Sequence, residues 1–380
     1  MRLSLVTETF PPEVNGVAMT LNRLVRGLAD RGHEVSVVRP RQGSRDAPDS
    51  EDPYTDVIVP GLPLPRYEGL RMGLPVYPRL IKMWRRQRPD IVHLATEGPL
   101  GWAALSAAER LGLPIASSYH TNFHQYGEHY GFGFGKGIAV AYLRHFHNRT
   151  HCTMVPTDEM KGTLRQEGYR NVTVMARGVD TDLFRPERRS EDLRRSWGLG
   201  PDDVAVVYVG RLAKEKNVDL AVKAFEAMRR IEPRSHFVLV GNGPENIPLR
   251  KRYPDFHYCG MRLGEDLAVH YASGDIFLFP SITETFGNVV TEAMANGLLV
   301  LTYDYAAGRQ FIRSWENGVL ARLDDSQDYL EKAGELMHRR AEWKALRAAA
   351  RDTALGITWG SVVVNFEQLL FDVMTRNRVF

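Results

Sequence analysis

Short apolar runs alternate with longer amphipathic segments along the whole chain. In the first half the apolar runs are residues 2–8, 34–40, 90–96, 113–119, 151–157 and 171–177, and their length and apolar character are typical of buried strands. Between them, residues 17–30 and 100–110 have helical spacing, and each segment ends shortly before a glycine that can take the left-handed backbone of a helix cap. Strands separated by helices predict βαβ units and a parallel sheet.

The same pattern restarts after a charged stretch at residues 186–198. The predicted strands there are residues 203–210, 236–241, 255–260, 275–280 and 298–303, and a helix is expected at 217–230. The last predicted helix, at about 360–375, follows a helix rather than a strand. We therefore expect an α/β protein with two Rossmann-like, doubly wound domains, residues 1–184 and 185–358, and a terminal helix in residues 359–380.

Composition narrows the class of protein. A length of 380 residues suits two domains, and a formal charge of +3 is too small to indicate nucleic-acid binding. Cys152 and Cys259 lie in different halves of the chain, which argues against a disulfide framework and favours a reducing compartment. The first ten residues do not resemble a signal peptide, and no apolar run is long enough to span a bilayer. We expect a cytoplasmic protein whose membrane attachment, if any, is peripheral and on the inner face of the cytoplasmic membrane.

Doubly wound sheets bind ligands beyond the carboxyl ends of their strands, and residues 283–297 follow such an end. Glu284 and Gly287 lie in the loop, and Glu292 lies one turn inside the helix that follows. The first amides of that helix form an anion site, Gly287 lets a phosphate approach the backbone, and carboxylates accept hydrogen bonds from sugar hydroxyls. The alternative is structural: Glu284 would cap the helix, and Glu292 would lie on a solvated face.

A second candidate follows the strand at residues 203–210. Gly210 ends that strand, and Arg211 and Lys216 lie on the loop after it. Two cations at this position can hold a diphosphate and offset its charge as it leaves. Basic loop residues can also be simply solvated.

The first half carries two weaker candidates. Asn15 and Gly16 lie at the start of the helix at 17–30, which suits either an anion or a plain turn, and the segment is not a GxGxxG fingerprint. His120 ends the strand at 113–119, where it can face a ligand or play a structural part. The glycines and aromatic residues that continue to residue 137 suggest an acceptor loop.

Two further segments can each be interpreted either as a binding site or as a structural element. Asp180 and Asp182 have the spacing of a metal-binding pair, but their turn context favours a structural role, and we expect no metal. Residues 77–90 interleave cations with apolar residues and could lie on an anionic membrane or simply cover the sheet. The candidate membrane contacts are Arg79, Lys82, Trp84, Arg85 and Arg86.

Taken together, these motifs resemble the retaining GT-B glycosyltransferases of family GT4 over nearly the whole chain. The Glu-x7-Glu motif of that family matches Glu284 to Glu292, and its Arg/Lys pair matches Arg211 and Lys216. The segments PPEVNGVA and SYHTNFHQY are similar to those of the GDP-mannose-dependent α-mannosyltransferase and sulfolipid-synthase-like branch. The resemblance implies two domains that face a central cleft, with the terminal helix crossing back onto the first domain.

The resemblance also implies roles for individual residues. Arg211, Lys216, Glu284 and His120 would be catalytic, with Arg211 and Lys216 holding the donor diphosphate and Glu284 the sugar hydroxyls. The implied donor-binding residues are Gly16, Gly210, Met261, Phe286, Gly287, Asn288, Val289 and Glu292. The implied acceptor-binding residues are Asn15, His120, Thr121 and Asn122. No cofactor is expected, and transfer would proceed without a bound metal.

The predicted reaction is α-mannosyl transfer from GDP-mannose to a lipid or lipid-linked glycan. The first domain would take the acceptor and the second the nucleotide sugar. The alternatives are a UDP-glucose or other UDP-hexose donor, a sugar-nucleotide epimerase and a catalytically silent nucleotide-sugar-binding protein. The intact set of Arg211, Lys216, Glu284 and His120 favours catalysis over silent binding.

Overall fold

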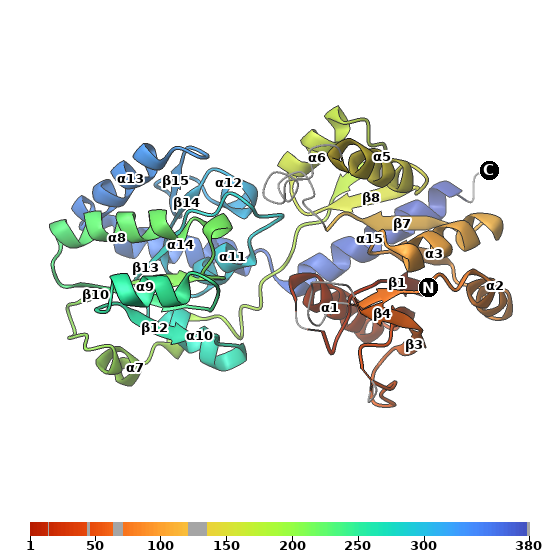
Figure 1. Ribbon diagram of the computed structural model, residues 1–380, viewed down its shortest axis with the longest axis horizontal. Helices are drawn as coiled ribbons and strands as arrows, with labels where there is room; N and C mark the ends of the chain where they lie inside the picture. Colours follow the sequence, from red (N-terminus) through yellow and green to blue (C-terminus); the bar gives the residue numbers. More distant parts are fainter. Residues whose placement is uncertain (14, 44–45, 64–70, 121–134, 378–380) are drawn as a thin grey trace. The chain divides into compact units, whose positions relative to one another are not determined.

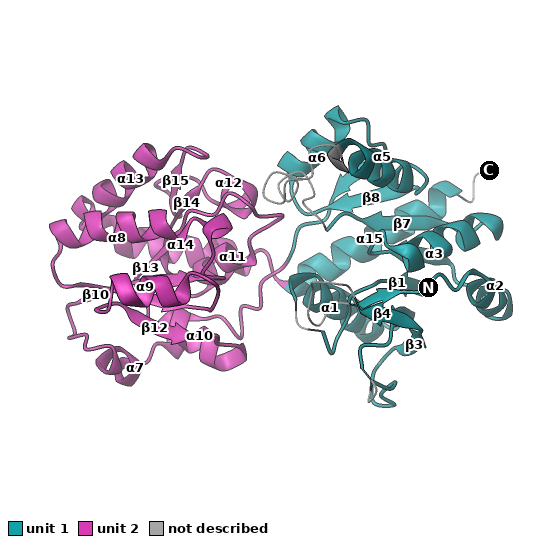
Figure 2. Ribbon diagram, in the orientation of Figure 1, with its two compact units in different colours: residues 1–177, 359–380 teal, residues 178–358 magenta. Residues whose placement is uncertain are grey.

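The computed structural model describes residues 1–380 except 14, 44–45, 64–70, 121–134 and 378–380. The chain divides into two compact units, one made of residues 1–177 with 359–380 and one of residues 178–358 (Figure 2). The division falls after Arg177 rather than after residue 184. The last helix belongs to the same unit as the amino-terminal half of the chain.

A parallel sheet forms the centre of the first unit, in the order β3-β2-β1-β6-β7-β8-β9. Its strands are β1 (Arg2–Val6), β2 (Glu34–Pro40), β3 (Thr55–Val59), β6 (Ile91–Leu94), β7 (Ile115–Ser118), β8 (Cys152–Val155) and β9 (Val172–Val174). A small antiparallel pair, β4 (Gly61–Pro63) and β5 (Arg71–Gly73), lies outside that sheet. Neither β3 nor this pair was predicted, because each is short and carries little apolar periodicity.

Helices cover both faces of this sheet (Figure 1). They are α1 (Gly16–Asp30), α2 (Tyr77–Arg86), α3 (Pro99–Arg110), α5 (Gly135–His147), α6 (Asp158–Gln166) and α15 (Trp359–Asn377). One apolar cluster joins α1 and α15 to β1 and β2, and another joins α2 and α3 to the opposite face. Successive strand residues point to opposite faces of the sheet, so that Leu5 lies in the first cluster and Val6 in the second. The sheet is therefore stabilised by apolar packing on both of its faces.

The close packing of α15 on α1 depends on a small residue at position 27. A Cβ added to Gly27 would lie 2.5 Å from Cγ2 of Val363, so no larger residue fits without movement. Glu367 of α15 also pairs with Arg31 and His33 just beyond the end of α1, with its carboxylate 2.6 Å from the guanidinium and 2.5 Å from the imidazole. A helix that is remote in sequence is thus held on the first unit by apolar packing and ion pairs.

Helix α2 has its cations exposed and its tryptophan buried. Trp84 is 2% exposed, lies in the apolar cluster with Leu80, and donates a hydrogen bond from Nε1 to Oγ of Ser4 at 3.1 Å. The prediction that Trp84 contacts a membrane is therefore wrong, because its ring fills the space between α2 and the sheet. The cations Arg79, Lys82, Arg85 and Arg86 are exposed.

The second unit has a parallel sheet in the order β12-β11-β10-β13-β14-β15. Its strands are β10 (Val204–Val209), β11 (Ser235–Val240), β12 (His257–Gly260), β13 (Ile276–Phe279), β14 (Leu299–Tyr303) and β15 (Val319–Ala321). Its helices are α7 (Glu191–Ser196), α8 (Val218–Ile231), α9 (Asn246–Arg252), α10 (Gly264–Ala272), α11 (Asn288–Ala295), α12 (Ala306–Phe311), α13 (Ser326–His338) and α14 (Trp343–Leu355). Short 3-10 turns lie at η1 (Pro186–Arg188), η2 (Lys214–Lys216) and η3 (Arg340–Glu342).

Two Rossmann-like parallel sheets with helices on their faces confirm the predicted α/β class. The strand order of each sheet reverses once, between β1 and β6 in the first unit and between β10 and β13 in the second. Ligands of doubly wound proteins bind at such points, beyond the carboxyl ends of the strands. Within the described residues no helix combines the length and the apolar character needed to cross a membrane.

Candidate active site

The loops after β10 and β13 meet at the point where the strand order of the second sheet reverses. Nζ of Lys216, from the first loop, lies 2.5 Å from Oε1 of Glu284, from the second. Thr283 also donates a hydrogen bond from Oγ1 to the carbonyl of Glu215 at 2.9 Å. An ammonium and a carboxylate from two predicted motifs are therefore brought together at the expected edge of the sheet.

Glu284 is held from several sides. The hydroxyl of Ser281 donates to its Oε1 at 2.8 Å, and the phenol of Tyr305 donates to its backbone carbonyl at 2.7 Å. The side chain is only 17% exposed. These contacts fix the carboxylate, so that it needs little rearrangement to receive a hydroxyl group.

Arg211 stands in a different environment. Its side chain is 62% exposed and pairs with Oε1 of Glu215 at 3.2 Å, while Tyr208 donates a hydrogen bond to its carbonyl at 3.2 Å. The backbone of Arg211 is thus anchored and its guanidinium extends into solvent. A ligand can recruit such a side chain without breaking a buried contact.

A glycine precedes helix α11. Gly287 has a φ of 90°, in the left-handed region that favours glycine, and as the N-cap residue it offers no side chain to the first amides of the helix. The side chain of Phe286 is fully buried against Phe311, so a donor contact at this position falls to its backbone. The amides of Asn288 and Val289 and the positive end of the helix dipole make this a favourable place for an anion.

Glu292 lies inside the same helix and is half-buried. The phenol of Tyr271 donates a hydrogen bond to its Oε2 at 2.9 Å. Burial raises the pKa of Glu292 to about 7, and this hydrogen bond only partly offsets the effect. The carboxyl is therefore not on a solvated face, and Tyr271, which no sequence motif indicated, positions it.

The loop after β11 approaches the loop after β10 so closely that side chains are excluded. A Cβ on Gly241 would lie 1.9 Å from the carbonyl oxygen of Gly210, and one on Gly243 would lie 2.4 Å from that of Leu212. These glycines were not predicted as site residues, although a Gly-x-Gly directly after an apolar run was the available signal. Met261 follows β12 and is 66% exposed at the same edge of the sheet.

In the first unit, Asn15 caps α1. Its Oδ1 accepts hydrogen bonds from the amides of Val17 and Ala18 at 3.0 and 2.9 Å. Its amide nitrogen donates to Oε1 of Glu13 at 2.6 Å and to Oγ1 of Thr9 at 2.8 Å, which fixes the orientation of the cap. Asn15 therefore shapes the loop, and Gly16 is the first residue of the helix.

A carboxylate of the protein itself fills the start of α3, at the reversal point of the first sheet. Oε1 of Glu8 accepts a hydrogen bond from the amide of Leu100 at 3.0 Å, and Oε2 accepts one from the amide of Gly73 in β5. A Cβ on Gly98 would overlap this carboxylate, and burial raises the pKa of Glu8 to about 7. No room remains there for the phosphate of a ligand.

His120 follows β7 at the carboxyl edge of the first sheet. Both ring nitrogens are buried and have no hydrogen-bond partner among the described residues. Burial, and next the charge of Arg177, hold the pKa of His120 well below its usual range, so the ring is neutral at pH 7. The predicted acceptor residues Thr121 and Asn122 lie outside the described residues.

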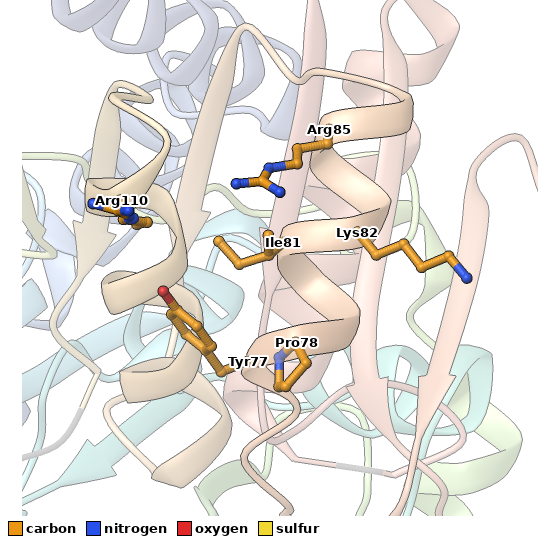
Figure 3. Close-up of a pocket in the computed structure, with 6 residues that line it drawn as sticks. All are labelled: Tyr77, Pro78, Ile81, Lys82, Arg85 and Arg110. Carbon is orange, nitrogen blue, oxygen red and sulfur yellow. The ribbon is translucent and has the colours of Figure 1, made fainter.

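The remaining sequence candidates lie apart from these loops. Oδ1 of Asp180 accepts a hydrogen bond from the amide of Leu183 at 3.0 Å, as expected for a turn. In the described part of the chain, no group of three or more His, Cys, Asp or Glu side chains is arranged to hold a metal ion. A hollow of about 500 Å³ lies between α2 and α3, where Ile81 and Arg85 point toward α3 (Figure 3). Its lining residues are Tyr77, Pro78, Ile81, Lys82, Arg85 and Arg110.

Two Rossmann-like units with polar residues gathered at the carboxyl edges of their sheets are the architecture of GT-B glycosyltransferases. A solved structure with this fold, sucrose-phosphate synthase from Thermosynechococcus elongatus, superposes with a TM-score of 0.79 at 17% identity and covers 99% of both chains. The chain belongs to glycosyltransferase family 4: the model of Glycosyltransferase Family 4 matches residues 14–183, and that of Glycosyl transferases group 1 matches residues 203–339.

Curated relatives agree with this membership. A GDP-mannose-dependent alpha-mannosyltransferase of Mycolicibacterium smegmatis is 36% identical over 94% of both chains. The sulfoquinovosyl transferase SQD2 of Arabidopsis thaliana is 29% identical over 94% of this chain and 71% of its own length. An alpha-monoglucosyldiacylglycerol synthase of Acholeplasma laidlawii is 27% identical over 93% of this chain and 92% of its own. The predicted family and the predicted hexosyltransferase class are confirmed.

Proposed function

We propose that this glycosyltransferase moves mannose from GDP-mannose to a lipid or lipid-linked glycan, with retention of the α configuration. The observation that carries the proposal is the group at the β10/β13 edge of the second unit. There, the Lys216–Glu284 ion pair lies beside the glycine-capped start of α11, and the half-buried Glu292 lies further along that helix. A nucleotide sugar presents a diphosphate, sugar hydroxyls and ribose hydroxyls, and this group can receive all three.

The chemistry of each side chain suggests its part. Lys216 and the exposed guanidinium of Arg211 hold the diphosphate and neutralise the charge that develops as it leaves. Glu284 accepts hydrogen bonds from the sugar and Glu292 from the ribose, and the amides at Gly287, Asn288 and Val289 contact phosphate or sugar. Gly210 and Met261 border the nucleotide, with Met261 acting through its backbone.

The first unit suits the acceptor. Glu8 already occupies the anion site at the reversal point of its sheet, which leaves the second unit as the place for the diphosphate. His120 is neutral and its ring nitrogens are unsatisfied, so it can hydrogen-bond to a hydroxyl without adding charge. The name of the Acholeplasma relative, an alpha-monoglucosyldiacylglycerol synthase, supports a lipid acceptor, and the name of the Mycolicibacterium relative supports transfer of mannose in the alpha configuration.

A lipid acceptor requires contact with a bilayer. Arg79, Lys82, Arg85 and Arg86 on the exposed side of α2 are the residues that could bind anionic headgroups, and Arg110 adds a cation to the same surface. The buried Trp84 holds the helix to the sheet and takes no part in this contact. We propose a peripheral site on the cytoplasmic face of the membrane.

The alternative donor is UDP-glucose or another UDP-hexose, because a glucosyl relative shares nearly the whole chain. A thermal-shift screen of the purified protein against GDP, UDP, ADP and their sugars distinguishes the donors. A nucleotide present at one hundred times its dissociation constant stabilises the fold by about 2.7 kcal/mol. GDP and GDP-mannose should give the largest shift, and a shift with UDP alone would overturn the choice of donor.

A further inference from the structure

Glu97 is a buried carboxylate at the carboxyl edge of the first sheet, and the proposed function assigns it no role. It lies in the loop between β6 and α3, at the point where the strand order of this sheet reverses. The residue is 8% exposed, although proteins rarely bury glutamate unless its charge is paired. Ligands of doubly wound proteins bind at such a place, so the surroundings of this carboxylate decide what it can do.

A buried histidine holds the carboxylate in place. Oε1 of Glu97 lies 3.0 Å from Nε2 of His147, whose side chain is fully buried. Because a carboxylate oxygen only accepts hydrogen bonds, Nε2 is the donor. The other ring nitrogen, Nδ1, lies 2.9 Å from Oγ of Ser117, which in turn lies 2.9 Å from Oγ1 of Thr150. This buried chain of polar groups fixes the imidazole ring, and the ring fixes the carboxylate.

The second oxygen of Glu97 is left for a ligand. In the described part of the chain no group donates a hydrogen bond to Oε2, and this atom is not fully buried, so it reaches the surface of the first unit. The phenol of Tyr142 donates to the backbone carbonyl of Glu97 at 2.5 Å and leaves the carboxylate unused. A purely structural partner for His147 needs one oxygen and no charge. The carboxylate offers a second, charged acceptor at the edge where ligands bind.

The groups beside Glu97 suit an uncharged ligand that carries hydroxyl groups. Tyr142 is 41% exposed and its ring lies 5.5 Å from that of Trp102, so an aromatic surface adjoins the loop. Burial, and to a smaller extent the charge of Glu97, raise the pKa of Glu8 to about 7, which shows that the two carboxyl groups are neighbours. Two neighbouring carboxyl groups repel a phosphate, whereas a hydroxyl group can donate to Oε2.

Glu97 and His120 lie on adjacent loops. They follow β6 and β7, which pair directly in the sheet. Burial is the main cause of the lowered pKa of His120, and the charge of His147 contributes to it, so the histidine that holds Glu97 also lies near His120. The carboxylate therefore belongs to the same edge as the neutral imidazole that is proposed to meet an acceptor hydroxyl.

We propose that Oε2 of Glu97 accepts a hydrogen bond from a hydroxyl group of the acceptor, with His147 as a positioning residue, and that this subsite takes an uncharged headgroup. The inference rests on the proposed glycosyl transfer and narrows its acceptor. The hydroxyl belongs either to a hexose or to a glycerol, because both present the same O–H donor to a carboxylate.

The test follows transfer of labelled mannose from GDP-mannose to octyl mannoside, octyl glucoside and 1-octylglycerol, with octyl phosphate as a competitor of the same chain length. The wild type should use a neutral probe, and the better of the sugar and glycerol probes identifies the source of the hydroxyl. Octyl phosphate should not compete. Competition by octyl phosphate at the concentration of the neutral probe, or no transfer to any neutral probe, would overturn the inference.

The matched variant is Glu97→Gln, which keeps the size of the side chain and an oxygen for His147 but places an amide nitrogen where Oε2 stood. KM for the neutral probe should rise about 10- to 100-fold, the scale of a lost hydrogen bond to a charged group. The dissociation constant of GDP-mannose without acceptor should stay within twofold. Glu109→Gln removes an exposed glutamate that pairs with Arg149 at the other end of α3 and should behave as the wild type. An acceptor KM within twofold of the wild type in folded Glu97→Gln would contradict the proposal.

Further variants separate positioning from folding. Glu97→Asp keeps the charge and withdraws it by one methylene, so it should also raise the acceptor KM, and it covers the case in which Glu97→Gln does not fold. His147→Gln keeps an N–H donor for the carboxylate and should retain a lower acceptor KM than His147→Phe. An unchanged acceptor KM in Glu97→Asp would count against the site. A wild-type protein that ignores GDP-mannose would contradict the proposed donor alone, since the probes are then tested with the nucleotide sugar that binds.

Discussion

The two glutamates of the Glu-x7-Glu motif differ in what surrounds them. Glu284 receives hydrogen bonds from Lys216 and Ser281, whereas Glu292 receives one from a phenol and is half-buried. Burial raises the pKa of Glu292 to about 7, so this carboxyl is partly neutral at neutral pH. One motif therefore supplies two carboxyl groups with different partners.

Replacing Lys216 should remove most of the turnover. Lys216→Ala deletes the cation nearest to Glu284, and by comparison with lost oxyanion donors kcat should fall by about a hundredfold or more. Lys214→Ala removes an exposed lysine from the same 3-10 turn and should leave kcat unchanged. Steady-state kinetics of the two variants check this, and near-normal turnover in Lys216→Ala would remove Lys216 from the mechanism.

The raised pKa of the half-buried Glu292 should make donor binding pH-dependent. Its pKa of about 7 means that it is largely protonated at pH 6, and a ribose would bind best to the ionised form. Affinity for GDP-mannose should therefore rise up to about tenfold per pH unit below pH 7 and level off above it. Calorimetric titrations from pH 5.5 to 8.5 measure this, and a Glu292→Gln variant with the same pH profile as the wild type would contradict it.

Burial of Glu292 also affects stability. A carboxyl whose pKa is raised on folding contributes stability that is fully present below its unfolded pKa and is lost as the pH rises through 7. The stability of Glu292→Gln relative to the wild type should therefore increase from pH 4.5 to pH 8. The change in the difference between their free energies of unfolding should be on the order of 2–3 kcal/mol. Denaturant unfolding at both pH values gives the comparison, and a constant difference would show that Glu292 is not desolvated.

The sequence predicted the site residues that lie in local motifs at strand ends. Arg211, Lys216 and Glu284 follow apolar runs directly, so their place at the sheet edge follows from chain order alone. Tyr271 could not be found in this way, because it reaches Glu292 through a contact that is distant in sequence. Such contacts depend on how helices and loops pack, which a single sequence does not encode in any short pattern.

At the scale of elements, α1 and α15 pack through a glycine. Gly27→Ala would place a methyl group 2.5 Å from Cγ2 of Val363, and overpacking of this kind costs about 1–3 kcal/mol. Val363→Ala removes the obstructing methyl groups, so the double variant should lose less stability than the two single losses combined. Denaturant unfolding of the four proteins tests this, and strictly additive losses would show that the two helices are not in close contact.

Helix α2 shows why one prediction failed. Leu80 and Trp84 are four residues apart and lie on the same face of the helix, which is the spacing of a buried stripe. The cations lie around the other side, so the sequence already held the signal that separates the tryptophan from the charged surface. The prediction placed Trp84 and the cations on one surface because they are neighbours in the sequence, although they lie on different faces of the helix.

At the scale of the whole molecule, the exposed cations of α2 should bind anionic membranes. Each cation near the surface contributes about 1 kcal/mol, and this declines with salt. The protein should pellet with anionic vesicles at low salt, and Arg85→Glu/Arg86→Glu should weaken this without unfolding it. Lys251→Glu/Arg252→Glu reverses two exposed cations at the end of α9 and serves as the control. Absence of the wild type from the vesicle pellet would favour a soluble acceptor.

The fold of both units was predictable because apolar runs and amphipathic segments alternate along most of each unit. The position of the division, after Arg177, was harder to predict, because the segment that connects the two units has the sequence pattern of a loop. The short strands β3 and β15 were also missed, because runs of five and three residues are too short to show a strand period.

The central claim is tested most directly by following labelled mannose from GDP-mannose into a lipid fraction, with the wild type and Lys216→Ala side by side. The account predicts that the wild type forms an α-linked mannolipid and releases GDP, and that Lys216→Ala forms about a hundredth as much or less. Equal transfer by the two proteins, or transfer from UDP-glucose and none from GDP-mannose, would contradict it.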